Sequence, residues 1–290
     1  MNSLEYLLER AEEQKRELWD TILRELSDSE EERTKIYNET KRRLSIMRNC
    51  VNEGLTSKRM SLSKLTGDNT GKYYGHVKSG KSILGSVMGK ICAYALACAE
   101  VNSFMGVIVA APTAGSCGIM PSALIALSEE YGFDDDMLTK ALVVSAGVGM
   151  VIANRATIAG AQGGCQAECG SAAAMSAAAV AYLFGGDPEA CIHAATLAVK
   201  NSLGLTCDPV AGLVEVPCVK RNGVFSVIAV TCADMALSGI RSVIPPDEVI
   251  DAMRETGEAI PGAYRETSKG GLAVTPTGVR IKQELFGNKE

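Results

Sequence analysis

The stretch SAAAMSAAAVAYLF, residues 171–184, consists almost entirely of alanine and other small or aliphatic side chains. Alanine is the strongest helix former, and its small side chain suits closely packed helices. The run is too short, and too closely flanked by glycine, to span a bilayer. It therefore predicts a buried helix over about 170–185 in a helical protein.

A similar composition extends outward from this stretch through most of the 290 residues, of which 47% are hydrophobic and only 5% are aromatic. Strand signals are scarce, and the best of them, VIVAAP at 107–112, is short. The predicted fold class is therefore all-α. Further apolar helices are expected over 83–106, 119–131, 136–155, 188–203, 219–242 and 247–258.

The N-terminal part of the chain is charged and amphipathic rather than apolar. Helices are predicted over 1–26 and 30–54, and Ser29 with Glu32 forms a capping-box pattern at the start of the second. This pair of helices is interpreted as an arm that docks a partner or, equally, as a solvated helical hairpin.

Two domains are predicted, an N-terminal helical arm over 1–56 and a helical domain over 57–290. Residues 61–82 are polar and rich in glycine, and they lack an apolar period. We expect this segment to be a loop that packs on the domain.

The net charge of −5, without a dense patch of Lys and Arg, argues against a nucleic-acid partner. The first residues contain no signal-peptide core, and no apolar run is long enough for a membrane span. The sequence thus predicts a cytoplasmic protein without a membrane partner. In that reducing compartment the ten cysteines are thiols or metal ligands rather than disulfides.

Most of the cysteines lie in contexts typical of packing. A cysteine inside an apolar helix is usually a small buried hydrophobe. Cys50 lies in the charged arm and has no predicted role in chemistry. The cysteines predicted to be buried in this way, inside or at the edges of apolar runs, are Cys92, Cys98, Cys191, Cys218 and Cys232.

Three other cysteines share a different pattern. Cys117, Cys165 and Cys207 each follow glycine within a few residues, in turns beside helix ends. Helices are expected to begin near the first two, and a helix N-terminus favours thiolate over thiol. Cys169 is ambiguous, since it could share a helix face with Cys165 or simply pack.

Three thiolates from separate loops, without a CxxC pair, indicate a metal centre with one open position rather than a closed structural zinc site. An open position is what Lewis-acid catalysis requires. The alternative is that the three loop cysteines share no role.

Four motifs together resemble the α chain of iron–sulfur L-serine dehydratase. They are AAPTAGSCGIMP (110–121), NRATIAGAQGGCQAECG (154–170), GLTCDPVAGLVEVPC (204–218) and AYRETSKGGLAV (263–274). The resemblance, from about Ser61 to Val274, implies an all-helical catalytic domain that converts L-serine into pyruvate and ammonia. It also implies a 4Fe-4S cluster with one open iron site, held by three cysteines that match Cys117, Cys165 and Cys207.

The resemblance further implies a β subunit whose Ser-Ser-Ser-His motif contributes to the active site. This chain lacks that motif, and its histidines are His76 and His193. It is therefore interpreted as the α subunit of a two-chain enzyme, and further homo-oligomerisation is left open. A pyridoxal-phosphate enzyme would need an α/β fold, so we expect no such cofactor.

Candidate substrate-binding residues are also implied by the matching motifs. The loop SLSKLTGDNTGKYY (61–74) is expected near the substrate through Ser63, Thr66 and Gly67. Lys64 and Asp68 replace glycines that are usual in the family, and Asn69 replaces Asp. These departures leave the choice between serine and a close analogue open.

Glu100 and Asn102, just before the first cysteine loop, are candidate catalytic or substrate-contacting residues, with a helix-end salt bridge and cap as the alternative. Thr113, in that cysteine loop, is a candidate substrate contact.

The YRETSKGG segment supplies the remaining candidates, with a solvated C-terminal turn as the alternative. Arg265 and Lys269 are expected to hold the substrate carboxylate, and Ser268 to donate a hydrogen bond, as could Thr267. Gly270 and Gly271 would let the backbone approach the substrate closely.

Two further functions remain open at the level of sequence. In a cysteine desulfidase, the open iron would take sulfur instead of oxygen. In a protein of another class, the metal or cluster would serve a non-catalytic interaction.

Overall fold

The computed structural model describes residues 1–287, and these contain helices and no β-strand, which confirms the predicted all-α class. The residues 288–290 at the end of the predicted 57–290 domain lie outside this description. The longer helices are α1 (Leu4–Gln14), α2 (Leu18–Glu25), α3 (Glu30–Thr56), α4 (Asn69–Lys78), α5 (Gly85–Ser103), α6 (Ile119–Tyr131), α7 (Asp135–Arg155), α9 (Ser171–Leu183), α10 (Pro188–Lys200), α11 (Cys218–Leu237), α12 (Pro246–Ala259) and α13 (Pro276–Phe286).

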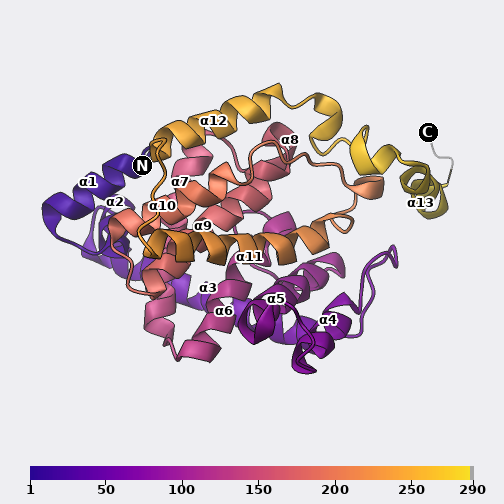
Figure 1. The fold of residues 1–290 in the computed structure, drawn as a ribbon, viewed down its shortest axis with the longest axis horizontal. Coiled ribbons are helices and arrows are strands. Elements are labelled where there is room, and N and C mark those ends of the chain that lie inside the picture. Colours follow the sequence, from indigo (N-terminus) through magenta and orange to yellow (C-terminus); the bar gives the residue numbers. More distant parts are fainter. Residues whose placement is uncertain (288–290) are drawn as a thin grey trace.

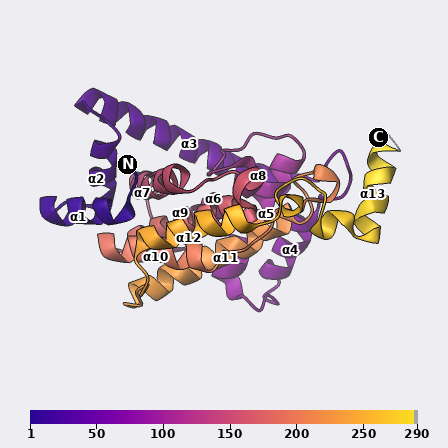
Figure 2. The ribbon, with the colours of Figure 1, turned by 90° about the horizontal axis from the view of Figure 1, so that it is seen from above.

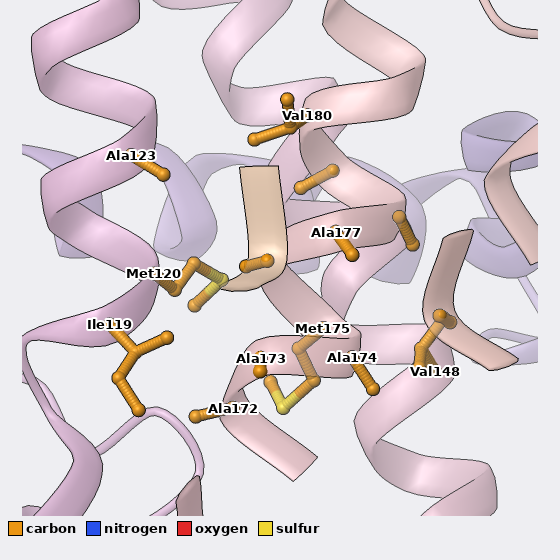
Figure 3. Packing of buried hydrophobic residues seen from close by; sticks show 14 of the residues in the cluster. Ile119, Met120, Ala123, Val148, Ala172, Ala173, Ala174, Met175, Ala177 and Val180 are labelled. Atoms are coloured by element: carbon orange, nitrogen blue, oxygen red, sulfur yellow. The ribbon is translucent and has the colours of Figure 1, made fainter. Parts of the chain in front are cut away.

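The alanine-rich stretch forms α9, and every residue of this helix except Tyr182 is buried. Helices α6, α7, α10 and α11 all pack against it. Figure 3 shows alanines of α9 meeting Met120 from α6 and Val148 from α7. Because alanine adds little beyond the backbone, the surrounding helices approach α9 closely and fill the interior.

The remaining helices are arranged in layers around this centre. Helix α3 packs on α5, α6 and α7, whereas α10 and α11 cover another side of α9 and α12 packs on α10. Figure 2 shows α3 along one side of the molecule and α11 and α12 along the other. Helices α1 and α13 lie at opposite ends (Figure 1).

The N-terminal arm differs from the prediction in one respect. The expected helix over 1–26 is divided into α1 and α2, because Lys15 adopts a left-handed conformation with φ +50°. The predicted cap of the next helix is present, since Ser29 Oγ accepts from Glu32 N at 3.1 Å.

The arm also packs on the rest of the chain instead of standing free as a solvated hairpin. A Cβ on Gly147 of α7 would lie 2.5 Å from Ile22 Cδ1 of α2. A Cβ on Gly54 of α3 would lie 2.3 Å from the Ala97 carbonyl oxygen of α5. The division into domains at residue 56 stays a prediction.

The prediction of a loop over 61–82 is wrong for its middle part, which forms α4. Gly71 and Gly75 weaken the helical signal, and the Asp68 side chain provides no cap hydrogen bond. The Glu100 carboxylate of α5 caps the helix instead, accepting from Asn69 N at 2.9 Å and Thr70 N at 3.2 Å.

Two other segments complete the comparison with the predicted elements. The helix α13 was not predicted, although Thr275 caps it and Pro276 follows at the first position, which is a typical start signal. The weak strand signal at 107–112 forms no strand.

Among residues 1–287, α7 is the one helix long and apolar enough to cross a membrane. Its most apolar window is 67% buried inside the protein. This burial is typical of a core helix, and α7 packs on α9, α3 and α2.

Replacement of Gly54 by valine tests how closely α3 approaches α5. The new side chain would collide with the Ala97 backbone, and overpacking of this kind costs about 1–3 kcal/mol. Chemical denaturation should show a loss of that size. Gly75→Ala, where a Cβ meets nothing within 4 Å, is the matched control and should not destabilise. An unchanged stability for Gly54→Val would contradict the close approach.

Candidate functional site

Glu168 is the point at which the three predicted cysteine loops come together. It lies in a single π-helical turn, η2 (Gln166–Gly170), directly after Cys165. Thr113 Oγ1, from the loop of Cys117, donates to Glu168 Oε1 at 2.9 Å. Cys207 Sγ lies 3.8 Å from Glu168 Oε2.

Glycine makes room for this carboxylate. A Cβ on Gly160 would lie 2.6 Å from Glu168 Oε2, and one on Gly115 would lie 3.1 Å from Oε1. Burial, and then the negative charge of Cys165, raise the pKa of Glu168 to about 7. Glu168 is not among the residues predicted from the sequence, although an acidic residue between Cys165 and Cys169 in GCQAEC is a visible signal.

Cys165, Cys169 and Cys207 form a buried sulfur group. The Sγ atoms of Cys165 and Cys169 are 3.4 Å apart. Hydrogen bonding with Cys169 and Cys207 holds the pKa of Cys165 well below its usual range, and the positive charge of Arg221 acts in the same direction. Hydrogen bonding with Cys165, together with burial, raises the pKa values of Cys169 and Cys207. Cys165 is therefore the cysteine of this group that is held toward the thiolate form.

Cys218, at the start of α11, lies within reach of the charge of Cys165, although the sequence indicated only a packing role. Burial, followed by the charges of Cys165 and Glu168, raises the pKa of Cys218 to about 12. Its place in GLVEVPC, just before a predicted helix and eleven positions after Cys207, was the available signal.

Cys117 has different neighbours. Its Sγ donates to the Cys98 carbonyl oxygen at 3.7 Å, and burial and the nearby Cys50 raise its pKa. Cys165 and Cys207 thus belong to one group of buried sulfur atoms. The loop of Cys117 is connected to this group through the hydrogen bond from Thr113 to Glu168. Within residues 1–287 no group of three or more His, Cys, Asp or Glu side chains is arranged to ligate a single metal ion.

Residues 264–272, which we call the strap, run alongside the loop of Cys207. Cys207 N donates to Tyr264 O at 2.8 Å, and Glu266 N donates to Cys207 O at 2.8 Å. Ser268 Oγ donates to Pro209 O at 2.8 Å. These bonds hold the YRETSKGG motif against the loop of Cys207.

The individual strap residues differ in their environments. Arg265 Nη1 donates to Gln162 O at 3.3 Å, whereas its buried Nε has no hydrogen-bond partner in the part of the chain that the structure describes. Lys269 is exposed and Gly270 is buried. Gly271 has φ +58°, and a Cβ there would lie 2.4 Å from Asp208 Oδ2.

The loop that begins at residue 61 is held by a second buried carboxylate, that of Glu215. Ser61 Oγ and Ser63 Oγ donate to Glu215 Oε2 at 2.6 and 2.7 Å. Glu215 lies between Cys207 and Cys218 in the sequence, so these bonds bring Ser63 toward the cysteine loops.

The remaining candidate substrate contacts, Glu100, Asn102, Thr66 and Gly67, have partners within the chain itself. Glu100 caps α4, which agrees with the helix-cap interpretation; Asn69 Nδ2 donates to Glu100 Oε1 at 2.7 Å and to Thr66 Oγ1 at 3.0 Å. Asn102 Nδ2 donates to Ala114 O at 3.2 Å and links α5 to the loop of Cys117. Gly67 packs tightly, since a Cβ there would lie 2.4 Å from Met60 Sδ.

Comparison with known proteins gives a consistent result. The family described as "Serine dehydratase alpha chain" matches residues 5–273. The "Probable L-serine dehydratase, alpha chain" of Bacillus subtilis (strain 168) is 46% identical over 92% of this chain and 88% of its own length. The "L-serine dehydratase, alpha chain" of Peptoniphilus asaccharolyticus is 41% identical over 99% of this chain and 98% of its own.

A third relative is longer. "L-serine dehydratase 1" of Escherichia coli (strain K12) is 44% identical over 62% of this chain, which corresponds to 40% of its own length. Together these matches confirm the resemblance that the four motifs predicted.

Replacement of Glu215 by alanine tests the buried connection to the loop of Ser63. Two hydroxyl donors would lose their acceptor, and an unsatisfied buried polar group costs about 1–3 kcal/mol. The variant should lose that much stability in urea and become more sensitive to protease near residues 58–66. Glu9→Ala, which removes an exposed carboxylate from α1, should change neither measurement. An equal result for the two variants would contradict this role of Glu215.

Proposed function

The chain belongs to the serine dehydratase alpha chain family, and from this premise we propose that it is the α subunit of a two-chain, 4Fe-4S-dependent enzyme. The proposed reaction converts L-serine into pyruvate and ammonia in the cytoplasm, without pyridoxal phosphate. The observation that carries the proposal is the convergence of buried cysteine loops and the strap around Glu168.

The chemistry of the donor set suits an iron–sulfur cluster. Thiolate is the usual ligand of such clusters, and Cys165 is held toward thiolate by its neighbours. We assign Cys165 and Cys207 as two ligands. The third is Cys117, as the motif match implies, or Cys218, whose pKa is raised in part by the charge of Cys165. The cluster, when bound, would supply a Lewis-acidic iron for the serine hydroxyl.

The strap is proposed to bind the carboxylate of the substrate. Arg265 has an unpartnered buried Nε, and a guanidinium is well suited to carboxylate recognition. Lys269 adds positive charge on the same segment, and Gly270 and Gly271 leave the backbone accessible. Ser268 Oγ already donates to Pro209 O, so its role is to hold the strap. Bound in this way, serine would be oriented before its α-proton is removed.

Removal of the α-proton needs a base within hydrogen-bond reach. His193 Nδ1 accepts from Ser242 N at 3.2 Å, and His76 is exposed on α4. Two relatives are named alpha chains, and this chain matches only 40% of the longer relative. We therefore propose that a β subunit completes the active site and supplies the base.

Individual replacement of cysteines by serine tests the ligand set. Cys165→Ser and Cys207→Ser should each lower the iron and sulfide content of the anaerobically purified protein and its visible absorbance, because a cluster ligand is lost. One of Cys117→Ser and Cys218→Ser should do the same and identify the third ligand. Cys232→Ser, a buried cysteine on α11 outside the sulfur group, is the control. Full iron content in Cys165→Ser or Cys207→Ser would contradict the assignment.

Reconstitution with the β subunit tests whether turnover of L-serine needs both chains. The isolated chain, loaded with iron and sulfide, should form pyruvate from L-serine slowly or not at all, because it lacks the base. Addition of the purified β subunit should restore turnover. Full activity of this chain, shown by mass spectrometry to be free of a second polypeptide, would disprove the two-chain proposal.

A further inference from the structure

Asp208 follows Cys207 directly and is almost completely buried, with 5% of its surface exposed. Its two carboxylate oxygens have different partners. Oδ2 accepts from Leu272 N in the strap at 2.9 Å, and Oδ1 accepts from Arg221 Nη2 at 3.1 Å. Asp208 therefore connects the far end of the strap to helix α11.

Arg221 fixes the Cys207 loop from the other side. Its Nη1 donates to Thr206 O at 2.9 Å, and its charge lies close enough to Cys165 to favour the thiolate. The guanidinium thus braces Thr206 and Asp208, which flank Cys207. Such a buried pair needs both charges, because either one alone would be costly to bury.

The strap needs this external support, since its backbone is not in a relaxed conformation. Glu266 and Ser268 have φ values of +61° and +54°, and residues other than glycine rarely occupy that region. Gly271 also has a positive φ, and the Asp208 carboxylate occupies the space that a Cβ would need. Strained conformations of this kind persist only where the surrounding contacts enforce them.

We propose that Asp208 is a positioning residue for the substrate: through its bond to Leu272 and its contact with Gly271, it holds the strap so that Arg265 and the neighbouring backbone receive the substrate carboxylate. This inference rests on the proposed function. Asp208 itself does not touch serine. It acts through the strap, and Arg221 keeps its carboxylate in place.

Replacement of Asp208 by alanine, in the enzyme reconstituted with its β subunit, tests the inference. KM for L-serine should rise about tenfold, with kcat changed less than about threefold, because uniform binding of the carboxylate is lost. The inhibition constant of L-alanine, which keeps the carboxylate and ammonium but lacks the hydroxyl, should rise by the same factor. Amide hydrogen exchange across residues 264–272 should become faster, while iron content stays unchanged.

Gly271→Ala perturbs the same contact from the side of the strap and leaves Arg221 paired. It should also raise KM and the inhibition constant. In the double variant the colliding carboxylate is absent, so the combined effect should be smaller than the product of the two single effects. Asp234→Ala removes an exposed carboxylate from α11 and should match the wild type.

Three results would overturn the inference: an unchanged KM and inhibition constant in Asp208→Ala, a loss of iron from that variant, or independent effects of the two replacements. Absence of serine turnover in the wild-type enzyme would refute the proposed function instead. Hydrogen exchange needs no turnover and would still decide whether Asp208 holds the strap.

Discussion

The close packing of helices against the alanine side chains of α9 is the constraint on which the rest of the structure depends. Residues on all faces of this helix are buried, and α6, α7, α10 and α11 pack around it. The turn that carries Cys165 and Glu168 leads directly into α9, and Cys218 begins one of the packed helices. Larger side chains on α9 would separate the helices and, with them, the ends that carry the cysteines.

Within the site, buried charge is distributed so that each charged group has a partner. Arg221 lies between Asp208 and Cys165, so one cation stabilises two anionic groups. Glu168 forms no ion pair with a cation among residues 1–287; it accepts from Thr113 instead, and its pKa is raised toward neutrality. This arrangement follows the general cost of burying an isolated charge. On the strap, the buried Nε of Arg265 is a donor that lacks an acceptor among residues 1–287.

Carboxylates distant in sequence from their partners organise the loops around the cysteines. Glu100 caps α4, Glu215 binds Ser61 and Ser63, and Asp208 binds the strap. Each is buried and accepts from segments that contain few apolar residues of their own. Polar segments of this kind are therefore held by hydrogen bonds to buried carboxylates.

The sequence by itself determined the all-α class, most of the core helices and the family, because helical periodicity, alanine content and the four motifs are local properties of the chain. It also singled out Cys117, Cys165 and Cys207 as candidate ligands, since their glycine-rich turns are visible in the sequence. Only the tertiary structure decided that α4 is a helix, because its cap comes from Glu100, thirty-one positions after Asn69. Likewise it placed Glu168 against Cys207 and Asp208 against Leu272 of the strap, while the side chain of Cys117 donates to the Cys98 carbonyl oxygen. Burial and contacts between distant segments set the partners and pKa values of these groups, and no local pattern contains that information.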